Sequence, residues 1–226
     1  MWCCCPILLK ESKNSSIYQQ KDTVKKVIHC KKMYEKELAA LQKLTHPNIV
    51  SIDRINRNSF IMKYYPRGDM FFYIQNGLPE YVARHYAKQL IEALIYCHGC
   101  GISHRDVKPD NLLLSDDWNI ILCDFGLSTM KEIEDTYCGT AEYAPPEVFA
   151  NIPYNPKLAD TWSYGVTVYA MFMGILPWNG WSGSKSGKEF VRTCLHKDRP
   201  YLYEMSEHPW LKNAEVASYM SKIEIY

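Results

Sequence analysis

The stretch His104-Arg105-Asp106-Val107-Lys108-Pro109-Asp110-Asn111 is followed, thirteen positions after its last residue, by Asp124-Phe125-Gly126. Short apolar runs adjoin both segments: Leu112–Leu114 follows the first, and residues 120–123 precede the second. Each run predicts a strand of a few residues, so the two polar segments are expected to be turns beside short strands. Functional side chains are common in such positions.

Four residues of these turns carry groups suited to phosphoryl transfer, a reaction that depends mainly on positioning and charge neutralisation. The carboxylate of Asp106 can orient an incoming hydroxyl and accept its proton, and the ammonium of Lys108 can contact the transferring phosphate. Asn111 and Asp124 offer oxygen ligands of the kind that Mg²⁺ prefers, with phosphate oxygens of a nucleotide completing its shell.

With these residues in place, the chain resembles the protein kinases, whose catalytic loop and metal-binding turn have this form. The resemblance implies that Asp106 is the catalytic base and that Lys108 contacts the phosphate. It also implies that Asn111 and Asp124 bind Mg²⁺, and that ATP donates the phosphoryl group.

Further segments extend the resemblance over residues 9–211, nearly the whole chain. Residues 139–147 are similar to the end of the family's activation segment, with Pro-Pro-Glu in place of the usual Ala-Pro-Glu. Residues 160–165 are similar to the start of the family's helix αF, whose aspartate braces the catalytic loop. By the family's spacing, Arg199 would pair with Glu147 in a bidentate contact.

The nucleotide site is expected to include the ion pair that the family forms between a strand lysine and a helix glutamate. Glu37, nine positions before His46, fits the glutamate. Lys25 and Lys26 compete for the lysine, and strand alternation lets only one of them face the nucleotide; the resemblance favours Lys25. The expected ATP-binding residues are Leu9, Lys10, Ile17, Lys25, Glu37, Tyr64, Asp69 and Leu113.

One segment departs from the family pattern. Residues 10–17 align with the glycine-rich loop that covers ATP, but no residue before Gly68 is a glycine. Glycine lets backbone N–H groups approach phosphates closely and tolerates positive φ. The sequence therefore leaves open which groups of this segment bind the nucleotide. Lys10 is a candidate side-chain cation in place of those amides. The alternative function is a pseudokinase scaffold that binds partners with little or no phosphotransfer.

The pattern of apolar residues, with this resemblance, predicts an α+β fold of the bilobal protein-kinase type: a small antiparallel sheet lobe with one helix, and a larger, mainly helical lobe. Strands are expected at 7–9, 16–18, 23–28, 49–52 and 60–65, and helices at 32–44, 79–98 and 160–174. The expected kinase domain spans 7–211, with an N-lobe at about 7–65, a hinge at about 63–69 and a C-lobe at about 70–211. Residues 212–226 would form a short tail.

Lys108 in the catalytic loop and Thr140 in Gly-Thr-x-x-Tyr resemble the serine/threonine branch, so protein Ser/Thr hydroxyls are the expected acceptors. Asp69 and Asp110 would favour basic substrates, although Asp69 could instead bind the nucleotide ribose. Residues 97–104 and 111–114 look most like the calmodulin-dependent-kinase group and its checkpoint effector kinases, which act in the DNA-damage response.

Thr136 stands four positions before Thr140, where many relatives are phosphorylated, and Arg105 could pair with a phosphate there. Both are therefore candidate regulatory residues. Acidic neighbours, Glu132, Glu134 and Asp135, could instead mimic the modification, which would leave the enzyme active without it.

The composition limits the other partners. The chain has 26 basic and 25 acidic residues among 226, so it lacks the basic excess of most nucleic-acid or membrane binders. Its longest apolar run contains Gly174 and Pro177 and is too short to span a bilayer. Nine cysteines and no secretory leader favour a reducing compartment. We expect a monomer, cytoplasmic or nuclear, with protein substrates and without direct nucleic-acid or membrane binding.

Overall fold

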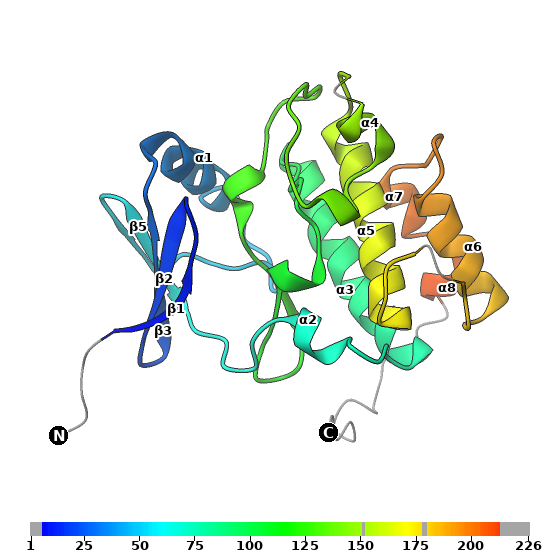
Figure 1. Ribbon diagram of the computed structural model, residues 1–226, viewed down its shortest axis with the longest axis horizontal. Helices are drawn as coiled ribbons and strands as arrows, with labels where there is room; N and C mark the ends of the chain where they lie inside the picture. Colours follow the sequence, from blue (N-terminus) through cyan, green and yellow to red (C-terminus); the bar gives the residue numbers. More distant parts are fainter. Residues whose placement is uncertain (1–5, 151, 178–179, 213–226) are drawn as a thin grey trace.

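The computed structural model describes residues 6–150, 152–177 and 180–212. A small sheet with one helix and a larger group of helices lie side by side, joined by the segment between β5 and α2 (Figure 1). The bilobal α+β arrangement predicted from the sequence is therefore confirmed.

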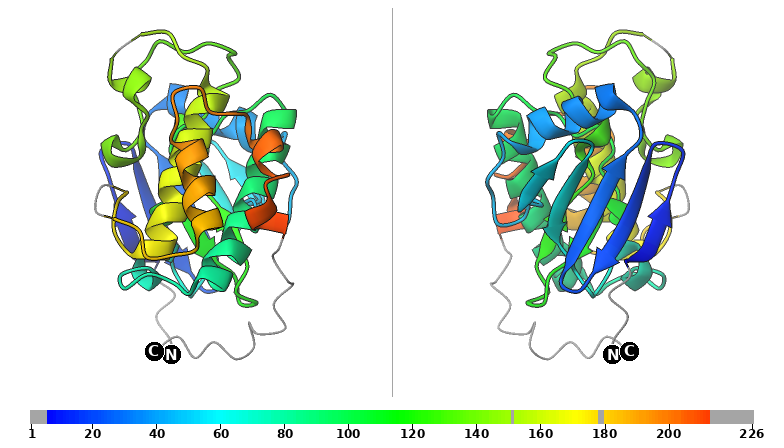
Figure 2. Two further views of the ribbon diagram at one scale, coloured as in Figure 1. Left: turned by 90° about the vertical axis from the view of Figure 1, so that its right-hand side faces the viewer. Right: turned by 90° about the vertical axis from the view of Figure 1, so that its left-hand side faces the viewer.

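The sheet of the smaller lobe has five antiparallel strands in the order β1-β2-β3-β5-β4. Figure 2 shows this sheet face on in its right-hand view. The strands are β1 (Ile7–Glu11), β2 (Ser15–Gln20), β3 (Thr23–Ile28), β4 (Arg54–Asn56) and β5 (Ser59–Lys63). In the β2–β3 pair Ile17 lies opposite Lys26, and this register decides which lysine enters the cleft between the lobes.

Helix α1 (Lys31–Leu41) packs against β3 and against the short helix η2 (Phe125–Leu127). Its inner face buries Tyr34, Glu37, Ala40 and Leu41, and the ring of Tyr34 stacks on Phe60 of β5 at a centroid distance of 4.8 Å. Because its other side meets η2, α1 joins the sheet to the Asp124 segment.

The larger lobe is built on α3 (Glu80–Gly99) and α5 (Pro156–Met173), which lie side by side with α6 (Lys185–Cys194) in Figures 1 and 2. Helix α5 is buried nearly all round, as its apolar sequence predicts. Asn155 caps its N-terminus by accepting the N–H groups of Lys157 and Leu158. The remaining helices are α2 (Met70–Tyr73), η1 (Pro109–Asn111), η3 (Ala141–Tyr143), α4 (Pro146–Phe149), α7 (Leu202–Met205) and α8 (Pro209–Lys212).

The two short strands expected beside the polar turns are β6 (Leu112–Leu114) and β7 (Ile120–Leu122), and they pair as an antiparallel hairpin. The prediction of a strand at residues 49–52 is wrong, and the short strand β4 begins after these residues. Ile49 makes only an isolated parallel bridge to Leu122, with Val50 N–H donating to the Leu122 carbonyl at 3.0 Å. The apolar run therefore packs between the lobes instead of joining the sheet.

The predicted tail, 212–226, lies outside the described residues apart from Lys212 at the end of α8. Among the helices of the described ranges, none combines the length and the apolar composition that crossing a bilayer requires.

Candidate active site

A cavity of about 500 Å³ lies between the lobes, lined by the sheet, by the segment after β5 and by both polar turns. Seven of the eight predicted ATP-binding residues line it, and so do Asn111 and Asp124. The seven are Leu9, Lys10, Ile17, Glu37, Tyr64, Asp69 and Leu113. The exception is Lys25.

The prediction of Lys25 as the nucleotide lysine is wrong, and Lys26 takes its place. Lys25 is exposed, whereas Lys26 is buried and lines the cavity. Side chains alternate across a strand, so Lys26 shares the inner face of β3 with Val24 and Ile28. The apolar residues at these two positions are the sequence signal that favours Lys26.

The Lys26 ammonium lies 2.6 Å from Glu37 Oε1 and 2.7 Å from Asp124 Oδ1. Burial disfavours the charged ammonium, but the two carboxylates more than offset that effect and raise the pKa of Lys26 above its ordinary value. Burial likewise opposes ionisation of Asp124, yet the charge of Lys26 lowers the pKa of that carboxyl to about 2. Lys26 is therefore held as a cation between α1 and the Asp124 turn.

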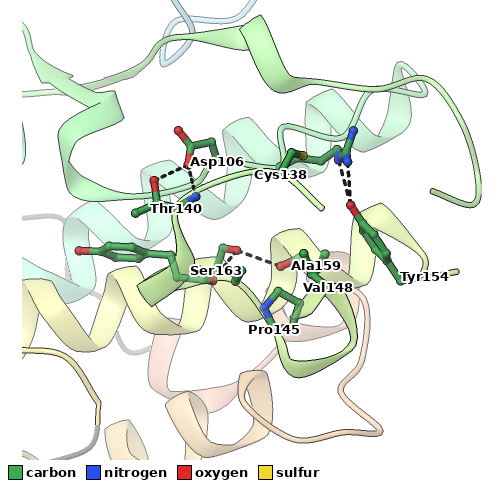
Figure 3. Close-up of a pocket in the computed structure, with 11 residues that line it drawn as sticks. Asp106, Cys138, Thr140, Pro145, Val148, Tyr154, Ala159 and Ser163 are labelled. Carbon is green, nitrogen blue, oxygen red and sulfur yellow. Dashed lines mark hydrogen bonds between the residues drawn. The ribbon is translucent and has the colours of Figure 1, made fainter. Parts of the chain in front are cut away.

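The carboxylate of Asp106 is contacted at both of its oxygens. The contacting residues are Lys108, Asn111 and Thr140. Oδ1 accepts the Thr140 backbone N–H at 3.0 Å and the Thr140 hydroxyl at 2.8 Å, a contact visible in Figure 3. Oδ2 accepts from Asn111 Nδ2 at 3.0 Å and lies 3.1 Å from Lys108 Nζ. Lys108 Nζ also donates to the Thr140 hydroxyl at 2.5 Å. The carboxylate is thereby fixed beside an ammonium and an alcohol.

The residues present fit a magnesium ion that shares its shell with a nucleotide. Asn111 donates through Nδ2 to the carbonyl and carboxylate of Asp106, which leaves its amide oxygen as the group suited to a metal. Cys123 N–H donates to the Asn111 carbonyl at 2.9 Å, so the turns that carry Asn111 and Asp124 are tied together. Within the described ranges no three His, Cys, Asp or Glu side chains form a metal-binding group, so phosphate oxygens would have to supply further ligands.

The segment in place of a glycine-rich loop is a tight turn between β1 and β2. Ser12 Oγ accepts the backbone N–H groups of Asn14 at 3.3 Å and Ser15 at 3.1 Å, and Ser12 N–H donates to the Ser15 carbonyl at 2.8 Å. None of residues 10–17, all of which are described, has a positive φ. A serine hydroxyl therefore satisfies amides of this turn, and no glycine is needed for its backbone.

Sequence reasoning missed several residues that shape the cavity. Val24 and Met62 line it from the sheet, Ser12 from the turn between β1 and β2, and Val50 from the segment before β4. Cys123, next to Asp124, lines it as well. Burial raises the pKa of the Cys123 thiol to about 12, so the thiol is neutral. The position of Met62 on β5 opposite Val24 of β3 could have identified it only once the strand register was known.

Two predicted supports of the site are present. Arg199 pairs with Glu147, through one hydrogen bond from Nη2 to Oε1 instead of the bidentate contact expected, and its Nε donates to the Leu158 carbonyl at 2.7 Å. Asp160 is fully buried and accepts backbone N–H groups of the catalytic loop. Thr136 and Arg105, the expected regulatory residues, are in contact, since Arg105 Nη2 donates to the Thr136 hydroxyl at 2.7 Å.

Comparison with known proteins agrees with this geometry. Residues 5–212 match the family model of the protein kinase domain. The chain is 34% identical over 210 residues to human testis-specific serine/threonine-protein kinase 3, an alignment that covers 78% of each chain. It is 36% identical over 190 residues to CBL-interacting serine/threonine-protein kinase 16 of Arabidopsis thaliana, covering 76% of this chain and 39% of the relative.

Proposed function

The chain belongs to the protein kinase family, of the eukaryotic serine/threonine type, and from that premise we propose that it transfers the γ-phosphoryl group of Mg-ATP to Ser and Thr hydroxyls of proteins. The observation that carries this proposal is the convergence of Asp106, Lys108 and Thr140. Asp106 lines a smaller hollow that shares Lys26, Glu37 and Asp124 with the main cavity.

The residues of the site divide the work as follows. Asp106 Oδ1 already accepts a hydrogen bond from an alcohol, that of Thr140, so this carboxylate is suited to orient a substrate hydroxyl and accept its proton. Lys108, 3.1 Å from Asp106 Oδ2, stabilises charge that develops on the transferring phosphoryl group. Lys26 binds the nucleotide phosphates in an orientation fixed by Glu37. Asn111 and Asp124 would hold Mg²⁺, which when bound neutralises phosphate charge.

Basic substrates follow from the carboxylates of Asp69 and Asp110, both of which line the cavity. Burial raises the pKa of Asp69, and the negative charge of Asp110 raises it further. A peptide library tests this assignment: preference for Arg or Lys upstream of the acceptor supports it. If Asp69→Asn changed only ATP affinity, Asp69 would serve the ribose instead.

Membership of the calmodulin-dependent-kinase group and a checkpoint role are finer proposals that rest on residues 97–104 and 111–114. A cell lacking this kinase should then fail to delay division after DNA damage, and normal arrest would contradict the role. The monomeric state, the cytoplasmic or nuclear location and the lack of nucleic-acid and membrane binding remain predictions.

The alternative is a pseudokinase scaffold, and the Ser12 turn is the observation that favours it. Amides that would otherwise be available to phosphates are engaged by the Ser12 hydroxyl. Two measurements separate the functions: a thermal-shift titration with Mg-ATP, and a γ-phosphate transfer assay with Asp106→Ala as control. Transfer that depends on Asp106 supports the kinase. Nucleotide binding without such transfer supports the scaffold.

A further inference from the structure

Arg105, the residue before Asp106, is held by an unusually complete set of contacts. Its guanidinium is buried and donates to the Tyr154 hydroxyl through Nε at 3.1 Å and through Nη2 at 2.8 Å. Nη2 also donates to the Thr136 carbonyl at 2.9 Å. A buried guanidinium is expensive without a counter-charge, so the anion that faces Arg105 determines whether this arrangement is stable.

That anion is Glu134. Its side chain is only 4% exposed, and Oε1 lies 3.3 Å from Arg105 Nη1. Oε1 also accepts the Thr129 hydroxyl at 2.6 Å, and Oε2 accepts the Thr136 hydroxyl at 3.1 Å. The Glu134 backbone exchanges two hydrogen bonds with Tyr154, at 2.9 and 2.8 Å. Glu134 and Tyr154 thus hold Arg105 from two sides.

Two further cations, Lys131 and Lys36, interact with Glu134. Lys131 Nζ lies 3.6 Å from Oε2. Lys36 of α1 donates to the Leu127 carbonyl at 3.3 Å, and the charges of Arg105 and Glu134 act on its ammonium. A group of cations from α1, the catalytic loop and the activation segment therefore surrounds one buried carboxylate. Without this carboxylate, a phosphate on Thr136 would be needed to neutralise these cations.

We propose that Glu134 is a positioning residue that holds Arg105, and through it Asp106, in the arrangement for phosphoryl transfer without phosphorylation of Thr136. This inference rests on the proposed kinase function.

Thr136 provides the complementary observation. Its side chain is on the exposed part of the segment, but its hydroxyl donates to Glu134 and accepts from Arg105. A phosphate on that oxygen would remove the O–H donor and place negative charge beside the Glu134 carboxylate. It would compete with Glu134 for Arg105, so phosphorylation is expected to add no activity.

The test uses the full chain, treated with phosphatase and shown by mass spectrometry to carry no phosphate at Thr136. The variants are Glu134→Gln, Thr136→Ala and, as a matched control, the exposed Glu132→Gln. The phosphatase-treated parent should keep its rate. Glu134→Gln should lower kcat about 10-fold or more by misplacing Asp106, with the ATP dissociation constant changed by less than about 3-fold. Glu132→Gln should match the parent.

A double-mutant cycle with Arg105→Gln shows whether Glu134 acts through Arg105. In the Arg105→Gln background, the additional effect of Glu134→Gln on kcat should largely disappear, because the residue it positions is absent. Undiminished kcat in Glu134→Gln would overturn the proposal, as would full additivity of the two changes or a loss of activity on phosphatase treatment.

A second readout does not depend on turnover. Hydrogen exchange at the backbone amides of residues 103–106 and 134–140 should be faster in Glu134→Gln than in Glu132→Gln, at temperatures where both are folded. Unchanged exchange in both segments would overturn the positional role even if the parent transferred no phosphate. Absence of Asp106-dependent transfer in the parent would instead overturn the proposed function.

Discussion

Asp160 Oδ1, at the buried start of α5, accepts the backbone N–H of Arg105 at 2.7 Å. Its other oxygen, Oδ2, accepts the N–H of His104 at 2.8 Å and hydrogen bonds to His98 Nε2 at the same distance. Arg105 has φ of 69°, a left-handed conformation that few residues other than glycine adopt. Such a conformation persists only where its surroundings fix it, and the Asp160 carboxylate is the group that does so next to Asp106.

Replacing Asp160 with Asn should therefore weaken both stability and catalysis. An amide can supply one acceptor oxygen, so its NH₂ group would face a backbone N–H and leave that buried donor unsatisfied, a penalty of about 1–3 kcal/mol. The melting temperature should fall by about 2–4 °C for each kcal/mol, and kcat by about 10-fold or more. Calorimetry and transfer kinetics measure the two effects. The exposed Asp117→Asn should change neither, and wild-type kcat in Asp160→Asn would contradict the account.

The two adjacent lysines of β3 allow an equally direct comparison. Lys26→Met removes the cation that joins Glu37 to Asp124, and phosphoryl transfer should fall by about 100-fold or more because the nucleotide phosphates lose their positioned partner. Lys25→Met changes an exposed residue and should stay within about 2-fold of the parent. Steady-state kinetics with peptide substrate measure both. Equal losses would show that the lysines share the role.

The contrast between these lysines illustrates what the sequence could predict. Asp106, Lys108 and Asn111 lie within six residues on one loop, so their spacing alone brings them together, and the structure places Lys108 and Asn111 beside Asp106 Oδ2. The choice between Lys25 and Lys26 depended on strand register, and a shift of one residue reverses the face. The apolar residues Val24 and Ile28 indicate the face of Lys26, and the β2–β3 register, with Ile17 opposite Lys26, fixes it.

The Ser12 turn could not be predicted from the sequence, and the sequence could not single out Glu134 among the acidic residues named for this role, for a related reason. The missing glycines were visible, but the turn depends on a hydroxyl accepting two amides, which is a matter of three-dimensional geometry. Glu134 was one of three acidic neighbours of Thr136, and only its backbone pairing with Tyr154 turns it toward Arg105. The strand expected at 49–52 failed because an apolar run can be buried between lobes without joining a sheet.

Lys10 offers a side-chain cation that could contact the nucleotide phosphates in place of the backbone amides of a glycine-rich loop. It lines the cavity from β1, and its charge acts on Asp69 and Cys123 across the cleft. Lys10→Ala should raise the ATP dissociation constant by about 3–10-fold, the size of one charge-assisted contact at a partly exposed site. Lys13→Ala, in the neighbouring turn and exposed, is the matched control. Isothermal titration with Mg-ATP makes the comparison, and equal affinities for the Lys10→Ala variant and the parent would exclude this role.

Arg199 should contribute to stability more than to catalysis. It is buried, pairs with Glu147 and donates to the carbonyls of Leu158 and His196 at 2.7 and 3.2 Å. Burial lowers the pKa of its guanidinium to about 10, so it remains charged at neutral pH. Arg199→Leu leaves the partly exposed Glu147 carboxylate and the Leu158 carbonyl without their partner and should cost about 1–3 kcal/mol of unfolding free energy. The exposed Arg192→Leu of α6 should cost less than about 0.5 kcal/mol. Urea unfolding measures both, and equal midpoints would refute the assignment.

The ionisation of Glu134 predicts how stability depends on pH. Burial raises the pKa of its carboxyl, but hydrogen bonding from Thr129 and the charge of Arg105 outweigh burial, so the pKa lies below its ordinary value of 4.5. A depressed pKa contributes stability that is fully present above about pH 4.5 and is lost as the pH falls through the lower value of the folded state. The difference in unfolding free energy between the parent and Glu134→Gln should therefore be largest near pH 7 and shrink below pH 4.5. Urea unfolding at a series of pH values measures it, with Glu132→Gln expected to track the parent throughout. A difference that stayed constant down to pH 3 would mean that packing, and not the charge of Glu134, accounts for its contribution.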